Sequence, residues 1–328
     1  MRKMSAAWSF GLCATVVALV FPAQSVAQTF PSKVVRIVNA QGPGTLDVLS
    51  RGYAQELSKY WGQPVVVEAR PGAGSILGAE AVARSAPDGY TLLVSSSAAY
   101  TVNQWVTKNM PYDPEKDLLP VFGIGRSPSL VTLAASLPVK SVQDLVALAR
   151  AKPGALNYGS AGIGSATHLQ VEIFLSEMGG LKMLHVPYKG INDIVRGITA
   201  GEVQMGFSAV PLTIGAAKAG QVRAPVIIGE RRDPSFPEVP TLREAGFPNS
   251  TGSIIWFGFA LPIKTPQAIV DRIATDLTRA SNEPTQKQIL EKTGWELMLT
   301  GPTAFGDLVK RERAVIGNVV AEIGLRPD

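Results

Sequence analysis

The stretch Lys33–Tyr60, KVVRIVNAQGPGTLDVLSRGYAQELSKY, decides the fold class. It opens with a β-branched apolar run, continues through a glycine-bearing loop and ends in an amphipathic segment. In that segment Leu49, Tyr53, Leu57 and Tyr60 recur at helical spacing, which predicts one buried face of a helix. A strand, a tight loop and a helix in this order form the first half of a βα repeat.

The loop inside this stretch, Asn39–Asp47, does not match a nucleotide-binding loop. Gly42 and Gly44 give the beginning of a dinucleotide fingerprint, but Asp47 stands where a third glycine or an alanine is needed. No Lys-Ser/Thr pair follows, so the P-loop pattern fails as well. The loop remains a candidate site for a small anion, because a helix N-terminus offers free N–H groups and a positive partial charge.

The βα pattern recurs along the chain and predicts an α/β protein with two units. It restarts near Pro128, and a further strand, helices and a long closing helix follow residue 252. The first unit is short of elements without that C-terminal part. We therefore predict a discontinuous lobe 1 (28–128 and 252–328) and a lobe 2 (129–251). Two mixed, mostly parallel sheets are expected, joined by hinge strands near 130–134 and 254–261.

Three of the predicted helices carry start signals. Ser141 is a predicted N-cap, and Thr167 with Gln170 matches a capping box. Thr265 is a predicted cap with Pro266 at the first helical position.

Residues 1–27 have the pattern of a signal peptide. Arg2 and Lys3 precede the apolar run SAAWSFGLCATVVALVF, and Ser25 and Ala27 form an A-x-A-like cleavage site. The alternative is an uncleaved anchor helix. Cleavage after Ala27 predicts a soluble, exported protein of the periplasm. It also removes Cys13, the only cysteine, so the mature chain has no thiol for a disulfide or a thiolate site.

Composition and charge are those of a soluble globular protein, with 46% hydrophobic and 17% charged residues among 328. Loss of Arg2 and Lys3 with the signal peptide lowers the net charge from +5 to +3. The cationic residues are scattered, without the basic stripe that nucleic-acid binding requires.

Few side chains suit acid–base or metal chemistry. His168 and His185 are the only histidines, and both are predicted to be packing or hydrogen-bonded residues. No G-x-S-x-G elbow and no H-x-x-x-H pair occurs. The alternating acids of PYDPEKDLLP fit a solvated turn better than a calcium loop. We therefore predict no catalytic residue, no metal and no cofactor, and a binder of a small anion in preference to an enzyme.

Two charged side chains have open roles. Arg70 is suited to pairing with a ligand carboxylate, to pairing with Glu68, or to holding its own loop. Asp47 is suited to a structural role in the first turn of its helix, or to accepting a hydrogen bond from a ligand hydroxyl, ammonium or bridging water.

The chain resembles a known family over almost all of its mature length. The motifs that carry the resemblance are GQPVVVEARPGAGSILGAEAVARSAPDGYTLL (Gly62–Leu93), MPYDPEKDLLPV (Met110–Val121), KPGALNYGSAGIGSATHL (Lys152–Leu169), HVPYKG (His185–Gly190), GEVQMGF (Gly201–Phe207) and FPEVPTLREAGFP (Phe236–Pro248). They resemble the Bug or TctC-like solute-binding components of tripartite tricarboxylate transporters. The resemblance implies a two-lobe periplasmic-binding-protein (Venus-flytrap) fold, capture of a small carboxylate, delivery to membrane permease subunits, and a monomer.

The resemblance also implies the ligand-binding residues. Those of the first lobe are Ala40, Gln41, Gly42, Gly44, Thr45 and Asp47, and those of the second lobe are Ser160, Gly162, Ser165, Ala166 and Thr167. Ser95, Ser96 and Ser208 are weaker transfers.

The first-lobe loop departs from the family pattern P-x-P-P-G-G-x-x-D, of which Gly44 and Asp47 remain. Ala40 is small where an aromatic residue is frequent, and Tyr100 and Trp105 lie near a cleft loop in sequence. The resulting hypothesis is a cleft suited to an aromatic carboxylate such as a benzene dicarboxylate. Two other functions fit the same sequence: a ligand sensor for a signalling partner, and an enzyme acting on a small carboxylate.

Overall fold

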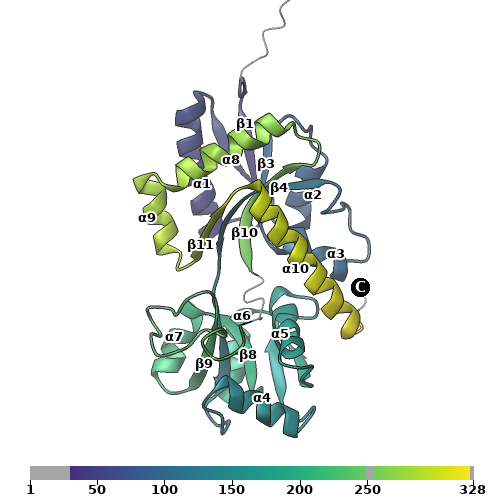
Figure 1. Ribbon diagram of the computed structural model, residues 1–328, viewed down its shortest axis with the longest axis vertical. Helices are drawn as coiled ribbons and strands as arrows, with labels where there is room; N and C mark the ends of the chain where they lie inside the picture. Colours follow the sequence, from purple (N-terminus) through teal and green to yellow (C-terminus); the bar gives the residue numbers. More distant parts are fainter. Residues whose placement is uncertain (1–29, 249–254, 326–328) are drawn as a thin grey trace, which may run out of the picture.

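The computed structural model describes residues 30–248 and 255–325 (Figure 1). The predicted signal peptide and its cleavage site lie outside the described residues, as does the predicted boundary at residue 252. The described chain forms two lobes, each built on one sheet with helices on its faces (Figure 1). The two-lobe α/β fold expected from the sequence is therefore present.

Lobe 1 contains a six-stranded sheet in the order β11-β4-β10-β3-β1-β2. Its strands are β1 (Val35–Asn39), β2 (Val65–Ala69), β3 (Thr91–Ser96), β4 (Leu118–Arg126), β10 (Trp256–Pro262) and β11 (Glu296–Thr300). Its helices are α1 (Thr45–Trp61), α2 (Ile76–Ala83), α3 (Asn103–Val106), α8 (Gln267–Ser281), α9 (Pro284–Lys292) and α10 (Pro302–Glu322), with a 3-10 turn η1 (Ala73–Ser75) and a π-helical turn η2 (Ala98–Val102).

Lobe 2 contains a five-stranded sheet in the order β7-β6-β8-β5-β9. Its strands are β5 (Ser129–Ala134), β6 (Asn157–Ser160), β7 (Leu184–Pro187), β8 (Met205–Ala209) and β9 (Val222–Ile228). Its helices are α4 (Val142–Ala151), α5 (Ala166–Glu177), α6 (Ile191–Ala200) and α7 (Val210–Lys218).

Both sheets are mixed, with fewer parallel pairs than βα repetition predicts. Among the named strands of the described chain, parallel pairing is confined to β2-β1-β3 and β7-β6-β8. The pairs that involve β10, β11, β5 and β9 are antiparallel. Within residues 30–248 and 255–325, β5 pairs only with lobe 2 strands and β10 only with lobe 1 strands. The first passage between lobes is therefore the short joint Ser127–Pro128, between β4 and β5.

Strand β4 (Leu118–Arg126) was not predicted from the sequence. It contains Pro120 and two glycines, which weaken the period-2 pattern of a strand. The structure explains both glycines by close approach of strand β11. A Cβ on Gly123 would lie 2.6 Å from Thr300 Oγ1, and one on Gly125 would lie 2.9 Å from the Glu296 carbonyl oxygen.

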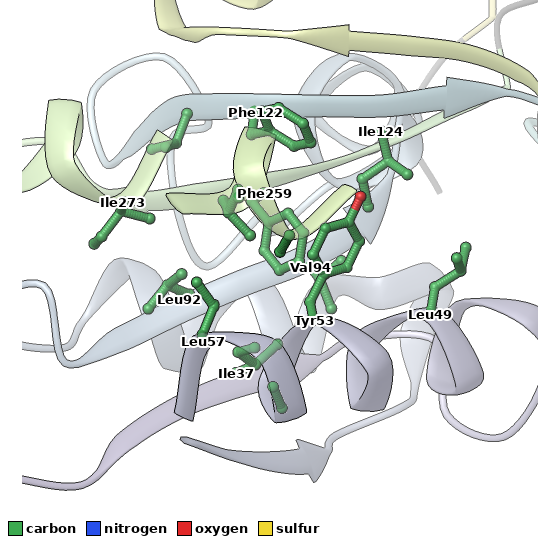
Figure 2. Close-up of a cluster of buried hydrophobic side chains, with 14 of the residues drawn as sticks. Ile37, Leu49, Tyr53, Leu57, Leu92, Val94, Phe122, Ile124, Phe259 and Ile273 are labelled. Carbon is green, nitrogen blue, oxygen red and sulfur yellow. The ribbon is translucent and has the colours of Figure 1, made fainter. Parts of the chain in front are cut away.

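The lobe 1 core has two layers, one on each face of the sheet. Figure 2 shows labelled side chains of α1, α8 and four strands meeting on one face. Tyr53 is fully buried there, packs edge-on against Phe259 with 5.3 Å between ring centroids, and shares a 2.8 Å hydrogen bond with Ser281. Helices α2 and α10 cover the opposite face. Alternation along β10 separates the layers, because Trp256 lies in one and Phe257 in the other.

The lobes also touch away from the joint. Leu169 and Ile173 of α5 pack with Ile316 and Val319 of α10 and with Val102 of η2. Lobe 2 has a separate core between its own sheet and helices α4 and α5.

Helix starts differ from expectation in two of three cases. Ser141 caps α4 as predicted, since its side chain accepts from the Asp144 N–H. The capping box predicted for Thr167 and Gln170 is wrong, because Ser165 caps α5. Thr167 Oγ1 instead accepts from the Ala161 N–H at 2.9 Å.

The third helix, α8, starts one residue later than predicted. Pro266 is its cap residue, and the Thr265 hydroxyl donates to the Pro262 carbonyl at 2.8 Å. Within residues 30–248 and 255–325, no helix is both long and apolar enough to cross a membrane.

Candidate ligand site between the lobes

A cleft of about 480 Å³ lies between the two lobes beside the Ser127–Pro128 joint. Its volume falls in the range of about 300–1,000 Å³ typical of small-molecule sites. Lobe 1 contributes the loop before α1, β10 and the turn before β11, and lobe 2 contributes the start of α7 and the segment after β9. The lining residues are Gln41, Gly42, Pro43, Gly44, Thr45, Leu46, Ser127, Pro128, Ala209, Val210, Pro211, Ile214, Asp233, Ser235, Phe257, Thr293, Gly294 and Trp295.

The lobe 1 wall is a loop held by Asn39, a residue the sequence analysis did not single out. The Asn39 side chain donates to the Gly42 carbonyl at 3.1 Å and accepts from the Gln41 N–H at 3.0 Å. Gly42 (φ 76°) and Gly44 (φ 144°) adopt left-handed backbone conformations that favour glycine. No side chain caps α1 at Gly44, and the Asp47 N–H donates to the Gly44 carbonyl at 3.0 Å, so the N–H groups of Thr45 and Leu46 and the positive end of the helix dipole border the cleft.

The opposite wall is the start of another helix. Helix α7 begins at Val210 without a side-chain cap, and Pro211 and Ile214 line the cleft beside it. Two helix N-termini therefore border the same cavity from different lobes. Among the described lining residues Asp233 is the only charged one, so a bound anion would meet helix ends and hydroxyl groups in place of a cationic side chain.

Aromatic rings form part of the cleft surface, but not the rings expected from the sequence. Phe257 and Trp295 stack face to face, with 4.0 Å between centroids and an interplanar angle of 2°. Both line the cleft. They come from β10 and from the turn after α9, so nothing local in the sequence connects them.

The residues on which the aromatic hypothesis rested face elsewhere, so they give it no support. Ala40 is buried and opens no space in the cleft. Its methyl group packs against Gly78, where an added Cβ would lie only 2.6 Å from the Cβ of Ala40. Tyr100 is fully buried and donates to the Gly258 carbonyl at 2.8 Å. Trp105 packs with α10 next to Gly317.

The two charged side chains with open roles have partners of their own. Asp47 lies in the first turn of α1 and pairs with Arg51 at 2.8 Å. Arg70 pairs with Glu68 at 2.5 Å. Neither side chain lines the cleft.

The predicted second-lobe loop, residues 160–167, forms its own hydrogen-bond network and is not among the residues that line this cleft. Ser160 Oγ lies 2.6 Å from His185 Nε2, and the Gly164 N–H donates to His168 Nδ1 at 3.0 Å. A Cβ on Gly164 would lie 3.0 Å from Val106, so the loop sits against α3 of lobe 1. Ligand contacts by Ser160, Gly162, Ser165, Ala166 and Thr167 stay a prediction.

The weaker serine candidates are buried inside the lobes. Ser208 Oγ shares hydrogen bonds with Thr132 Oγ1 at 2.8 Å and Thr213 Oγ1 at 2.5 Å. Ser95 and Ser96 lie buried in β3. Of the predicted residues, Gln41, Gly42, Gly44 and Thr45 line the cleft, whereas Ala40, Asp47 and the three serines do not.

The two histidines are packing residues, as expected. Their rings stack with 4.0 Å between centroids, and His168 is buried in the first turn of α5. Burial and the neighbouring His185 lower the pKa of His168 to about 4, and burial also lowers the pKa of His185. Both rings are therefore neutral near pH 7. Across residues 30–248 and 255–325, no three His, Cys, Asp or Glu side chains gather as a metal site.

The fold and the cleft define a class: a two-lobe solute-binding protein with its candidate site at the lobe junction. Residues 49–325 match the model of the tripartite tricarboxylate transporter family receptor, TctC, and the chain belongs to that family. The match begins at Leu49, so the cleft loop Gln41–Thr45 lies before the matched residues.

Similar proteins extend over nearly the whole chain. A UPF0065 protein of Bordetella pertussis is 31% identical, over 96% of this chain and 97% of its own length. The Rhodopseudomonas palustris protein Rpa4515, solved with adipate, is 32% identical with a TM-score of 0.69, over 91% of this chain and 100% of its own. MatC of the same species, solved with bound malate, is 29% identical with a TM-score of 0.66, over 89% of this chain and 100% of its own.

Proposed function

We propose that this protein, exported to the periplasm, captures a small carboxylate between its lobes and delivers it as a monomer to the permease subunits of a tripartite tricarboxylate transporter. The observation that carries the proposal is the pair of uncapped helix N-termini, α1 and α7, on opposite walls of one cleft. Rpa4515 with adipate and MatC with malate support a carboxylate as the ligand class.

Binding of such an anion requires no cationic side chain. Micromolar affinity corresponds to about 8 kcal/mol. Each hydrogen bond to a charged group contributes about 1.5–3 kcal/mol net, so three or four donors suffice. The first turn of α1 supplies backbone N–H groups, and Thr45 and Ser235 supply hydroxyl groups in the cleft lining.

A ligand held by both walls favours the arrangement in which the lobes are close, because contacts to both are made only there. The permease can then distinguish loaded from empty protein by lobe arrangement. Asp233 is the only titratable side chain among the described lining residues, so these residues offer a bound carboxylate no acid–base pair. This supports a binding protein in preference to an enzyme.

The test is a thermal-shift screen of the mature protein against malate, adipate, citrate and benzene-1,4-dicarboxylate, the last being one example of the aromatic carboxylates that the sequence suggested. A ligand at a hundred times its Kd stabilises the folded state by about 2.7 kcal/mol, which raises Tm by roughly 5–10 °C. Chromatography of each incubated compound checks for turnover. The proposal fails if no carboxylate raises Tm, or if a compound is converted to product.

A further inference from the structure

The aromatic wall of the cleft is a fixed surface. Phe257 lies on β10, which pairs with β3 on one side and β4 on the other, so its backbone is held from both sides. The backbone N–H of Trp295 donates to Thr293 Oγ1 at 3.0 Å, and the Thr293 hydroxyl donates to the Leu290 carbonyl at 2.7 Å. The two rings are therefore already positioned before a ligand arrives. A flat apolar group gains from such a surface without ordering it first.

Asp233 is the only charged side chain among the described residues that line the cleft. Its Oδ1 accepts from the Ser235 N–H at 2.7 Å, and within the described chain no Lys or Arg forms an ion pair with it. It lines both this cleft and the adjoining cavity of about 200 Å³, and Trp295 borders both as well. Arg231, Arg232, Glu291 and Glu296 line the adjoining cavity and not the cleft, so on the cleft side the charge is that of Asp233. A ligand that lies along Trp295 therefore has its far end near a carboxylate. Within the cleft, a second ligand carboxylate placed against Asp233 would be repelled, whereas a hydroxyl or an ammonium group would donate to it.

We propose that Phe257, Trp295 and Asp233 determine specificity, and that the ligand has one carboxylate, a flat apolar body and a hydrogen-bond donor at its other end. The carboxylate binds at the start of α1, the body lies along the stacked rings, and the donor meets Asp233. The inference rests on the proposed function. The expected ligand is therefore an aromatic monocarboxylate with a hydrogen-bond donor at its far end, in place of a benzene dicarboxylate.

The experiment is calorimetric titration of the mature protein with 4-hydroxybenzoate, benzoate, benzene-1,4-dicarboxylate and adipate. The expected order has 4-hydroxybenzoate tightest, with benzoate about tenfold weaker because it has no donor for Asp233. Benzene-1,4-dicarboxylate is expected to bind more weakly than benzoate. Tighter binding of adipate or of the dicarboxylate would overturn the inference and leave the proposed function standing. Binding of none of these compounds, nor of malate or citrate, would overturn both.

Variants assign the effect to residues. Trp295→Leu is expected to weaken 4-hydroxybenzoate about tenfold, whereas Trp295→Phe, which keeps a ring, stays within about threefold of the wild type. Trp105→Leu is the matched control, since that ring lies against α10. A loss in Trp105→Leu with none in Trp295→Leu refutes the assignment. Far-UV circular dichroism checks that each variant is folded. If Trp295→Leu does not fold, Trp295→Phe still tests the aromatic wall.

Asp233→Asn tests the charge alone, because asparagine keeps an oxygen for the Ser235 N–H. We expect this change to weaken 4-hydroxybenzoate about tenfold and to strengthen benzene-1,4-dicarboxylate, so the preference between the two narrows or reverses. If Asp233→Asn leaves the preference for 4-hydroxybenzoate over benzene-1,4-dicarboxylate unchanged, Asp233 does not contact the far end of the ligand.

Discussion

Glu296 joins the lobes beside the cleft, and its removal should weaken that junction measurably. This lobe 1 side chain is 8% exposed, and its Oε1 accepts from the lobe 2 backbone N–H groups of Glu230 at 2.7 Å and Arg231 at 3.1 Å. A Cβ on Gly229 would lie only 2.6 Å from that same oxygen, so the carboxylate sits directly on the backbone after β9.

The magnitude follows from two charge-assisted bonds. Each is worth about 1.5–3 kcal/mol, but Glu230 and Arg231 are exposed, so water replaces part of the loss. We expect Glu296→Ala to lower the free energy of unfolding by about 3 kcal/mol, and Glu296→Gln, which keeps an acceptor oxygen, by about 1 kcal/mol. With a urea dependence of about 3 kcal/mol/M, the alanine variant unfolds at about 1 M lower urea.

The assay is equilibrium urea unfolding followed by circular dichroism, with Glu230→Ala as the matched control. Glu230 also spans the lobes through a 2.5 Å ion pair with Arg126, but its side chain is 57% exposed. Its loss should cost no more than about 1 kcal/mol. If the midpoint of Glu296→Ala moves no further than that of Glu230→Ala, the buried carboxylate does not hold the junction.

Three further predictions concern the lobes themselves. Burial raises the pKa of Glu312 to about 8, above its unfolded value of 4.5. The folded state therefore holds the extra proton, and the free energy of unfolding falls as pH rises from about 4.5 to 8. Glu312→Gln should lose this pH dependence in urea titrations at pH 5 and pH 8, and an unchanged dependence would contradict the prediction. The pKa of His168 is lowered to about 4, so its contribution to the free energy of unfolding has the opposite pH dependence and is lost as pH falls from 6.5 towards 4. An NMR titration of its ring should show a midpoint well below 6, and a midpoint near 6.5 would refute the burial argument. Gly78→Val should destabilise lobe 1 by about 3 kcal/mol or more, because its Cβ would lie 2.8 Å from the Ala40 Cα, and a thermal midpoint within 2 °C of the wild type would count against that clash.

The sequence predicted what local periodicity determines. The helical spacing of Leu49, Tyr53 and Leu57 correctly placed α1 against the sheet, and all three side chains are fully buried. Strand β4 was missed because Gly123 and Gly125 allow the close approach of β11, which is about 170 residues away in the chain. Local pattern carries no information about such approaches.

The candidate site was predicted only in part, because local sequence pattern captures contacts between adjacent residues but not between distant ones. The loop before α1 is encoded by adjacent residues, and Gln41, Gly42, Gly44 and Thr45 do line the cleft. The aromatic wall is not local, since Phe257 and Trp295 meet only when β10 and the turn before β11 are in place. Proximity to a cleft loop in sequence misassigned Tyr100, whose ring belongs to the core beneath that loop.

The position of β10 between β3 and β4 has a consequence for the order in which the lobes can form. A ribosome releases β1 to β4 early, but β3 and β4 have no common neighbour until residues 256–262 have been made. The five strands of lobe 2 lie within residues 129–228 and can pair before the chain is finished. The lobe that begins first is therefore completed last, and a chain that stops at residue 248 contains the strands of one complete sheet and only part of the other.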